Sequence, residues 1–313
     1  MSAQRDYREL DRLTAELGSG ELCCESLQDE PLCRHTTFKI GGSVDRLITV
    51  ESEEQLSRIL RELKRLELPY FVLGKGSDLL VGDKGYPGVA LKLENFFASA
   101  GLMEDGESVS AGAGISLGGL CVFARDEGLA GLEFAWGIPG SVGGAVYMNA
   151  GAYGGEMKDV ISRVWYMDTE GRLLDNSGEE LGFGYRRSAF MDGGKIITRA
   201  ELRLAHGDKE EIAAKMNELK ARRFEKQPYD MPSAGSTFKR PKTGYAAALI
   251  EQCGLKGRRV GGAQVSPKHA GFVVNTGGAT CKDVLELMDI IRETVLRQTG
   301  IELEPEVRMI GEN

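Results

Sequence analysis

The chain has 313 residues, and this length predicts two or three compact units with a large buried core. Its formal net charge of -8 argues against general binding to nucleic acid or to a membrane surface. No apolar run approaches the ~18 residues of a membrane-spanning helix, and the first ten residues form no apolar signal segment. We therefore expect a cytoplasmic protein that binds neither nucleic acid nor membrane.

The first predicted elements lead from the N-terminus to a glycine-containing loop. Residues 1–33 are expected to form a helical N-terminal extension, and residues 35–50 alternate as strands do. Ser52 and Gln55 have the spacing of a capping box before an apolar helix face, and Pro69 ends that helix. The six cysteines show no CxxC pair, and Cys23, Cys24 and Cys33 beside His35 are a poor zinc set, so we expect neither disulfides nor a metal site.

A predicted strand over residues 70–73 runs directly into the loop at 74–78, which has the sequence GKGSD. Proteins of the α/β class often hold nucleotides at such a turn from a strand into glycines. The loop is not a GxGxxG fingerprint, because Leu79 stands in place of the third glycine, and it lacks the lysine-serine pair of a Walker loop. A nucleotide bound here therefore belongs to a different fold.

A second glycine-rich segment, residues 137–154, has the sequence GIPGSVGGAVYMNAGAYG. Glycines let the backbone approach a ligand closely and let successive N–H groups point into one concavity, so the segment is typical of a cradle for a phosphate-bearing ligand. Sharp corners and close sheet packing use glycine as well, and this structural reading stays open from the segment alone.

The last third of the chain predicts a second α+β domain after a boundary near residue 206. Asp208 and Glu211 cap a helix, a second helix covers 245–253, and a long helix runs from Thr280 to Gly300. Strands are expected near 260, over 271–275 and over 303–310. Between residues 220 and 270 there are 11 Lys and Arg against 3 Asp and Glu, which indicates either a docking site for an anion or a solvated basic face.

Several motifs in this order resemble one family, the UDP-N-acetylenolpyruvoylglucosamine reductases (MurB), over about nine-tenths of the chain. A set of motifs in the correct order is more specific than any one of them. The motifs are HTTFKIGG (35–42), GKGSDLL (74–80), the segment 137–154, GYRRS (184–188), PSAGSTFKRP (232–241), KHAGFVVN (268–275) and EPEVR (304–308). Residues 153–185 lack a long insertion with a substrate-covering tyrosine, so the chain resembles the shorter subtype.

The resemblance implies an α+β fold with an FAD-binding domain over 34–206 and a substrate-binding domain over 207–313. The first is a module of two α/β subdomains, of the vanillyl-alcohol oxidase and p-cresol methylhydroxylase type. The first loop has no His or Cys, so the FAD is expected to be non-covalent. The residues that would hold FAD are Gly74, Lys75, Gly76, Ser77, Asp78, Gly137, Ile138, Pro139, Gly140, Ser141, Gly144, Asn149 and Ala150. Relatives often carry Asn in place of Asp78 and of Arg240.

The family reaction transfers hydride from reduced flavin to C3 of an enolpyruvyl ether and a proton to C2, which yields UDP-N-acetylmuramate for peptidoglycan synthesis. By the resemblance, Arg186 stabilises the charge that develops on the substrate carboxylate, and Ser236 donates the proton to C2. Glu306 is the catalytic glutamate, either protonated beside the substrate carboxylate or paired with Arg186. Glu304 shares its predicted strand face, and only the family motif favours Glu306.

The resemblance also implies the partners of the enzyme. NADPH reduces the flavin and alternates with the nucleotide-sugar substrate in one pocket, and we expect a monomer. Lys226 matches a lysine that contacts the substrate diphosphate, and Tyr185, Arg240 and His269 are further candidates for binding substrate. His269 is equally compatible with a packed structural role.

Two other functions stay open at this point. An FAD oxidase acting on an alcohol or sugar with oxygen as acceptor would not need Arg186, Ser236 and the basic stretch together. A flavin-binding or nucleotide-sugar-binding module without turnover would need none of them.

Overall fold

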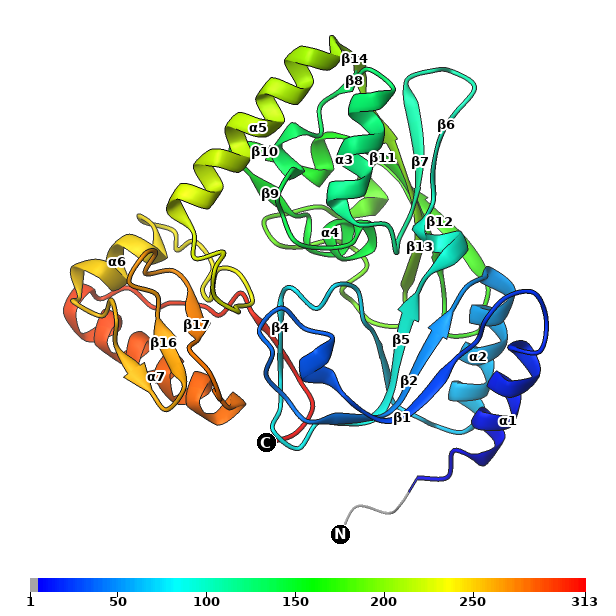
Figure 1. Ribbon diagram of the computed structural model, residues 1–313, viewed down its shortest axis with the longest axis horizontal. Helices are drawn as coiled ribbons and strands as arrows, with labels where there is room; N and C mark the ends of the chain where they lie inside the picture. The colour runs from blue at the N-terminus through cyan, green and yellow to red at the C-terminus, as the bar shows by residue number, and fades with distance from the viewer. Residues whose placement is uncertain (1–4) are drawn as a thin grey trace. The chain divides into compact units, whose positions relative to one another are not determined.

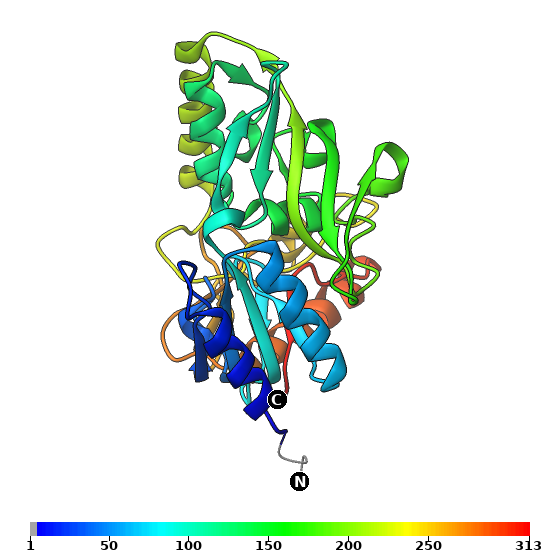
Figure 2. The same cartoon turned by 90° about the vertical axis from the view of Figure 1, so that its right-hand side faces the viewer.

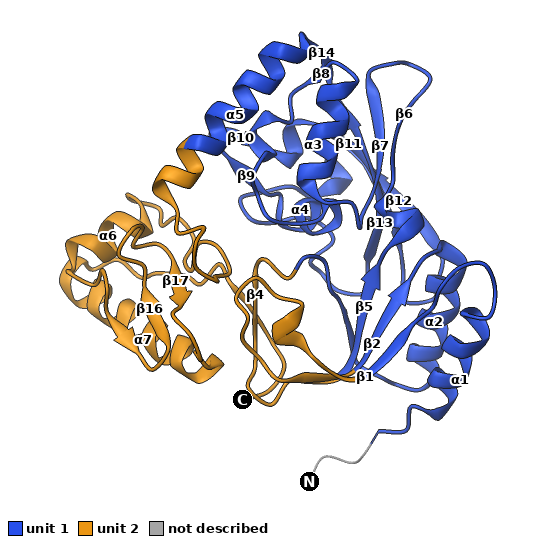
Figure 3. Ribbon diagram, viewed as in Figure 1, with its two compact units in different colours: residues 1–28, 46–75, 88–221 blue, residues 29–45, 76–87, 222–313 orange. Residues whose placement is uncertain are grey.

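The structure is a computed structural model that describes residues 5–313 (Figures 1 and 2). These residues form two compact units, shown in separate colours in Figure 3. Unit 1 contains the described residues up to 28 together with 46–75 and 88–221, and unit 2 contains 29–45, 76–87 and 222–313. The predicted domain boundaries at residues 33 and 206 stay a prediction, and the compact units differ from them because the short segments 29–45 and 76–87 associate with the C-terminal residues.

A four-stranded sheet and two helices form the N-terminal part of the fold. The strands are in the order β1-β2-β5-β3, and β3 is parallel to β5. Figure 2 shows the two helices side by side, and their buried leucines and isoleucine belong to the core of unit 1. The elements are α1 (Arg8–Leu17), β1 (Ser26–Pro31), β2 (Ser43–Val50), α2 (Glu53–Arg65), β3 (Tyr70–Val72) and β5 (Tyr86–Leu93).

Two predictions for this region were only partly right. Residues 1–4 of the expected helical extension lie outside the described residues. Among residues 5–33, α1 is the only α-helix, because the sheet takes up residues 26–31 as a strand, which a local pattern cannot foresee. The expected strand over 35–50 begins only at Ser43. Before it, Gly41 has a left-handed φ of 117°, which breaks an extended strand.

The start of α2 shows a variation on the predicted capping box. Ser52 Oγ accepts a hydrogen bond from the Gln55 N–H at 3.2 Å, as predicted. The Gln55 side chain, however, accepts from the Glu51 N–H at 2.8 Å rather than from Ser52. Two side-chain hydrogen bonds therefore stabilise the start of α2, and the bond made by the Gln55 side chain goes to Glu51, one residue before the helix cap Ser52.

A five-stranded antiparallel sheet in the order β12-β11-β13-β7-β6 forms the rest of the core of unit 1. Figure 2 shows helices on one side of it, and α4 packs on β7 and β13. The strands are β6 (Ala100–Leu102), β7 (Ser108–Gly112), β11 (Ile161–Met167), β12 (Leu173–Ser177) and β13 (Ile196–Arg203); the helices are α3 (Leu117–Asp126), α4 (Val142–Met148) and α5 (Lys209–Lys226).

Short elements complete unit 1, and their two-residue strands pair antiparallel as β8 with β14 and β9 with β10. They are η2 (Asn95–Ala98), β8 (Leu129–Ala130), η3 (Glu133–Ala135), β9 (Gly151–Ala152), β10 (Gly155–Glu156), η4 (Met157–Asp159), η5 (Gly178–Leu181) and β14 (Ala205–His206).

Unit 2 has its own hydrophobic core, formed mainly by the apolar face of α7 and by the strands beside it. Strands β15, β16 and β17 form a small antiparallel sheet, and β4 pairs in parallel with the C-terminal strand β18. The elements are η1 (Leu32–Arg34), β4 (Leu79–Val81), α6 (Ala246–Gln252), β15 (Arg259–Val260), β16 (Ala263–Val265), β17 (Val273–Asn275), α7 (Cys281–Thr299) and β18 (Arg308–Ile310).

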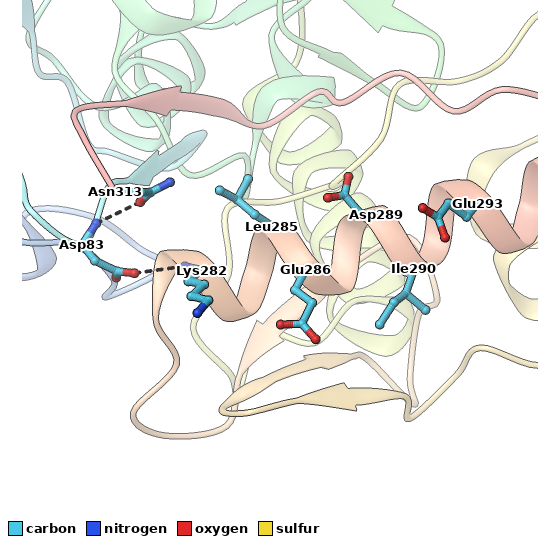
Figure 4. Close-up of a pocket in the computed structure, with 8 residues that line it drawn as sticks. All are labelled: Asp83, Lys282, Leu285, Glu286, Asp289, Ile290, Glu293 and Asn313. Atoms are coloured by element: carbon cyan, nitrogen blue, oxygen red, sulfur yellow. Dashed lines mark hydrogen bonds between the residues drawn. The ribbon is translucent and has the colours of Figure 1, made fainter.

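The long helix predicted from Thr280 is confirmed, and its start is capped twice. Thr280 and Asp283 form a capping box. Asp83, nearly 200 residues earlier, accepts hydrogen bonds from the N–H groups of Cys281 at 2.7 Å and Lys282 at 3.0 Å, and Figure 4 shows the bond from Lys282. A carboxylate interacts favourably with a helix N-terminus, so this contact is stabilising. It also joins the 76–87 segment to the C-terminal part of unit 2.

The final strand is shorter than the predicted 303–310. Regular pairing begins only at Arg308, so Glu306 lies just before β18 and not within it. Pro305 has no N–H to donate to a strand ladder and makes only an isolated bridge with Phe238. No helix in the described part of the chain has both the length and the apolar character needed to cross a bilayer.

Candidate active site

The first glycine loop leaves main-chain donors available for a ligand. Among residues 5–313 there is no protein acceptor for four successive main-chain N–H groups, those of Gly74, Lys75, Gly76 and Ser77. Leu73, immediately before them, still donates to Leu91 O at 2.8 Å, so the sheet ends where the open donors begin. Successive N–H groups of this kind make a favourable environment for an anion.

Gly76 packs against the segment that follows η1. Its φ is 59°, and a Cβ on it would collide with His35 O and with Thr36 Cα, so only glycine fits. The Thr37 N–H donates to Gly76 O at 3.1 Å. Thr36 Oγ1 is buried and has no hydrogen-bond partner among the described residues. A buried hydroxyl without a partner is costly, so a polar ligand atom at this place would restore the missing bond.

The second glycine loop meets the first inside unit 1. Ser141 is buried and caps α4, because its Oγ accepts from the Gly144 N–H at 3.4 Å. A Cβ on Gly74 would lie 2.6 Å from this Oγ, and one on Gly143 would lie 2.9 Å from Ala113 Cβ. The two glycine-rich loops of the sequence are therefore in contact, and the glycines permit that contact.

The beginning of the second loop carries further open donors. Gly137 has a φ of 84°, which turns the chain after Trp136, and the Ile138 N–H donates to Ala135 O at 3.0 Å. Among the described residues, no protein acceptor faces the main-chain N–H groups of Gly140 and Ser141. Trp136 Nε1 is likewise buried without a partner in the part of the chain that the structure describes.

These observations fit a ligand that carries both phosphates and a ring with polar edge atoms, as FAD does. In unit 1, the open N–H groups of Gly74, Lys75, Gly140 and Ser141 suit phosphate oxygens, and Trp136 Nε1 suits a polar ring atom. In unit 2, the N–H groups of Gly76 and Ser77 and the Thr36 hydroxyl offer the same kinds of contact. The predicted cofactor residues from 74 to 78 and from 137 to 144 all belong to these two loops. Thr36 and Trp136 were not predicted, although Thr36 lies within the HTTFKIGG motif and Trp136 directly precedes the second glycine-rich segment.

Asn149, predicted to contact the cofactor, uses its side chain on the protein. It is fully buried, and its Nδ2 donates to Glu156 Oε2 at 2.7 Å and to Gly184 O at 2.9 Å. Its Oδ1 accepts from the Lys158 N–H at 2.9 Å. Both amide donors are therefore engaged within unit 1. The neighbouring Ala150 donates its N–H to Ala145 O and so continues the end of α4.

Arg186 lies at the tip of a tight turn. Gly184 and Arg187 exchange main-chain hydrogen bonds of 3.0 and 3.1 Å, which leaves Tyr185 and Arg186 as the two turn residues. Arg186 has a left-handed φ of 52°, and its guanidinium carbon lies 5.1 Å from the centre of the Tyr185 ring. That ring is 51% exposed. The turn thus presents a cation and an aromatic side chain together.

Ser236 and Glu306 lie on neighbouring segments of unit 2. The Glu306 N–H donates to Thr237 O at 2.9 Å, directly after Ser236. The Thr237 N–H donates to Gly271 O at 2.8 Å, and its Oγ1 accepts from the Val273 N–H at 3.0 Å. Three distant motifs of the sequence therefore meet around Thr237.

The structure distinguishes the two glutamates that the sequence left open. Glu304 is exposed and forms an ion pair with Lys239. Glu306 is half-buried. The ion pair with Glu304 also engages the charge of Lys239, three residues after Ser236.

The other substrate candidates of unit 2 differ in character. Lys226 is exposed at the end of α5, and Arg240 is exposed with its guanidinium carbon 4.3 Å from the centre of the Tyr245 ring. His269 is half-buried, and its Nδ1 accepts from the Gly271 N–H at 3.2 Å. Burial lowers the pKa of His269, and the charge of Lys256 lowers it further. This lowered pKa favours the neutral form of His269, in which Nδ1 accepts from Gly271 and Nε2–H can donate to a ligand.

A hollow along α7 has the wrong charge for an anionic substrate. Its lining includes Asp83, Glu286, Asp289 and Glu293, with Lys282 as its one cation (Figure 4). Among residues 5–313 there is also no group of three or more His, Cys, Asp or Glu arranged to hold a metal ion.

The structure brings the predicted residues together in two sets. Unit 1 contains Gly74, Lys75, the 137–150 loop and the Arg186 turn, whereas unit 2 contains residues 76–78, Ser236, Glu306 and the basic candidates. Within unit 1 the glycine loops meet, and within unit 2 Ser236 and Glu306 lie on adjacent segments. The meeting of Arg186 with Ser236 and Glu306 stays a prediction.

Comparison with known protein families gives two matches along the chain. Residues 44–177 match the model of an FAD binding domain. Residues 227–310 match the model of the C-terminal domain of UDP-N-acetylenolpyruvoylglucosamine reductase.

Individual relatives match over nearly the whole chain. The UDP-N-acetylenolpyruvoylglucosamine reductase of Caldanaerobacter subterraneus subsp. tengcongensis is 46% identical over 97% of this chain and 98% of its own length. That of Clostridium tetani is 42% identical over 100% of this chain and 99% of its own length. The crystal structure of the enzyme (MurB) from Thermus caldophilus is 41% identical, with a TM-score of 0.79, over 92% of this chain and 98% of that one.

The predicted fold class is thereby confirmed. The chain is α+β, with an FAD-binding domain followed by the C-terminal domain of the UDP-N-acetylenolpyruvoylglucosamine reductases.

Proposed function

The chain belongs to the UDP-N-acetylenolpyruvoylglucosamine reductase family, and from this we propose that it reduces the enolpyruvyl ether of UDP-N-acetylglucosamine-enolpyruvate to UDP-N-acetylmuramate. It is an FAD-dependent oxidoreductase with NADPH as co-substrate. The observation that carries the proposal is similarity along the entire chain, so that the cofactor domain and the substrate domain match the same enzyme together. We place the reaction in the cytoplasm, which agrees with six cysteines that are all free thiols.

FAD, when bound, accepts hydride from NADPH and supplies it to C3 of the substrate. The residues that would hold it are those of the two glycine loops, with open N–H groups from Gly74 to Ser77 and at Gly140 and Ser141. Thr36 Oγ1 and Trp136 Nε1 would add polar contacts. Neither loop contains a His or Cys, which supports non-covalent binding.

Arg186 has the task of stabilising charge on the substrate. As hydride reaches C3, negative charge spreads from C2 onto the adjacent carboxylate. A guanidinium that donates two hydrogen bonds to this carboxylate stabilises the charge where it develops. By analogy with other donors to developing oxyanions, the contribution is about 3 kcal/mol.

Ser236 has the task of delivering the proton to C2. A serine hydroxyl is a weak acid, so it suits a strongly basic carbanion such as the one at C2. Glu306, on the adjacent segment, interacts with the substrate carboxylate and orients it beside Ser236. Glu306→Gln separates two forms of this role, because the amide can replace a protonated carboxyl but not a charged one. If the carboxyl is protonated, the variant keeps most of its turnover; if it is charged, the variant loses turnover.

Substrate binding is assigned to the exposed cations near the end of α5 and after Ser236. Lys226 and Arg240 provide charge for the diphosphate, and Tyr185 provides an exposed ring on the Arg186 turn. His269, whose lowered pKa favours the neutral form, contributes a hydrogen-bond donor. The local excess of positive charge between residues 220 and 270 supports this assignment.

Anaerobic mixing tests the proposed function. NADPH should bleach the absorption of the bound flavin, and the enolpyruvyl nucleotide sugar should restore it without oxygen. An FAD oxidase would instead be reduced by its alcohol or sugar and reoxidised by air. Bound flavin that NADPH bleaches but that the enolpyruvyl substrate fails to reoxidise contradicts the proposal.

A further inference from the structure

Two buried side chains join the turn that carries Arg186 to the end of α4. Asn149 Nδ2 donates to Gly184 O at 2.9 Å on one side of the turn. Ser188 Oγ donates to Tyr147 O at 2.7 Å on the other side. Asn149 and Ser188 are both fully buried. Because buried hydrogen bonds are costly to break without a replacement, these two bonds restrict where the turn can lie.

The surroundings of Asn149 determine which way its amide points. Nδ2 faces two acceptors, Glu156 Oε2 and Gly184 O, while Oδ1 faces a donor, the Lys158 N–H. The reversed amide would place oxygen against two oxygens and is excluded by this network. These three contacts therefore fix the orientation of the amide, so that Nδ2 donates to Gly184 O. These contacts satisfy both donors of the side chain, which leaves no amide N–H for a cofactor.

The turn needs such support because Arg186 adopts an unfavourable backbone conformation. Its φ of 52° is in the left-handed region, where a Cβ comes too close to the following carbonyl oxygen. At the second central position of a turn with positive φ, glycine is the usual residue. An arginine there persists only when the surrounding structure holds it, and such positions gather at functional sites.

We propose that Asn149, with Ser188, is a positioning residue that holds the Arg186 turn in the geometry needed to meet the substrate carboxylate. The second glycine loop then has two tasks, because its first part would hold the cofactor and Asn149, after the end of α4, positions the arginine. This inference rests on the proposed function, since it assigns Asn149 to the half-reaction that consumes the enolpyruvyl substrate.

The test uses Asn149→Gly in the FAD-loaded enzyme. Asn149 itself has a φ of 43°, which glycine adopts freely, so the variant removes the side chain but keeps the backbone. We expect reoxidation of reduced flavin by the enolpyruvyl substrate to slow at least 10-fold, with reduction by NADPH within 2-fold of the unmodified enzyme. Asn95→Gly is the matched control, because Asn95 also has a left-handed φ, 48°, but bonds Glu51 elsewhere in unit 1.

A second measurement reports on the turn without turnover. The Arg187 N–H is protected by its bond to Gly184 O. Its hydrogen exchange should accelerate at least 10-fold in Asn149→Gly and should stay unchanged in Asn95→Gly. In an Arg186→Ala background, Asn149→Gly should slow reoxidation no further, because the residue that it positions is already missing. If Asn149→Gly does not fold, Ser188→Ala tests the other bond with the same readouts.

The outcomes separate this inference from its alternatives. Weakened FAD binding with both half-reactions slowed equally would overturn it and assign Asn149 to the cofactor. Unchanged reoxidation and unchanged exchange would overturn it as well. If the unmodified enzyme is not reoxidised by the enolpyruvyl substrate, the proposed function fails, whereas the exchange result still decides whether Asn149 orders the turn.

Discussion

The contact between the two glycine loops predicts a specific defect in Gly74→Ala. A Cβ at this position would lie 2.6 Å from Ser141 Oγ, closer than the two atoms can approach. The neighbour is the hydroxyl that caps α4, so the cheapest response is rotation of Ser141 away from the Gly144 N–H. The variant therefore disturbs the helix start of the second loop through a residue of the first.

Two effects contribute to the expected loss of stability in Gly74→Ala. Loss of a serine cap costs about 1 kcal/mol, and inserting a methyl group into a filled site costs about 1 kcal/mol at the lower end of the usual range. A unit of 150–250 residues loses about 2–4 °C of Tm per kcal/mol. We therefore expect Gly74→Ala to unfold about 4–8 °C lower, and Ser141→Ala, which only removes the cap, about 2–4 °C lower.

The double variant Gly74→Ala/Ser141→Ala tests whether the two loops touch. Once Ser141 is alanine, the nearest atom to the new Cβ is the Cβ of residue 141 at 3.6 Å, which is an ordinary contact. Thermal unfolding followed by circular dichroism should place Gly74→Ala/Ser141→Ala within about 1–2 °C of Ser141→Ala alone, because the steric and cap terms are coupled. Additive losses in the double variant would refute the contact between the loops.

Two further predictions concern unit 2. Burial lowers the pKa of His269 in the folded protein, so near and below pH 6.5 the unfolded chain binds more protons than the folded one. The free energy of unfolding should therefore fall as the pH drops from 7.5 to 5.5. His269→Asn keeps an acceptor for the Gly271 N–H but cannot titrate, so its Tm should fall less over this pH range than that of the unmodified protein. An equal fall of Tm in both proteins would contradict the lowered pKa of His269. Lys226→Ala should raise KM for the nucleotide sugar about 10- to 100-fold, the worth of a charge-assisted hydrogen bond, with NADPH reduction unchanged. Lys215→Ala, on the same helix but paired with Glu218, is the control, and equal effects of both lysine variants would argue against a specific contact.

Local signals made much of the fold predictable. The ends of α7 were found because Thr280, Asp283 and Gly300 interact within one or two turns of the helix itself. The strand predictions failed where a single residue broke the pattern, at Gly41 before β2 and at Pro305 before β18. The cap from Asp83 to α7 spans nearly 200 residues and leaves no local trace.

The candidate site was predictable in its residues more than in its contacts. The glycine loops and the Ser236 and Glu306 motifs were identified through rare sequences in the correct order. Their contacts depend on long-range packing, so the sequence did not show that Gly74 touches Ser141 or that Thr237 joins Ser236 to Glu306. The assignment of Asn149 to the cofactor stays a prediction, and the hydrogen bonds of its buried amide within the protein could not be read from the sequence.

The central claim is that a hydroxyl of unit 2 protonates the substrate after unit 1 has provided the reduced cofactor. Ser236→Ala, reduced anaerobically by NADPH and then mixed with the enolpyruvyl substrate, measures this step in isolation, with Ser233→Ala as a control from the same segment. We expect reoxidation to slow by several orders of magnitude in Ser236→Ala only, while reduction by NADPH stays nearly normal. Reoxidation at the rate of the unmodified enzyme, or an equal loss in both half-reactions, would contradict it.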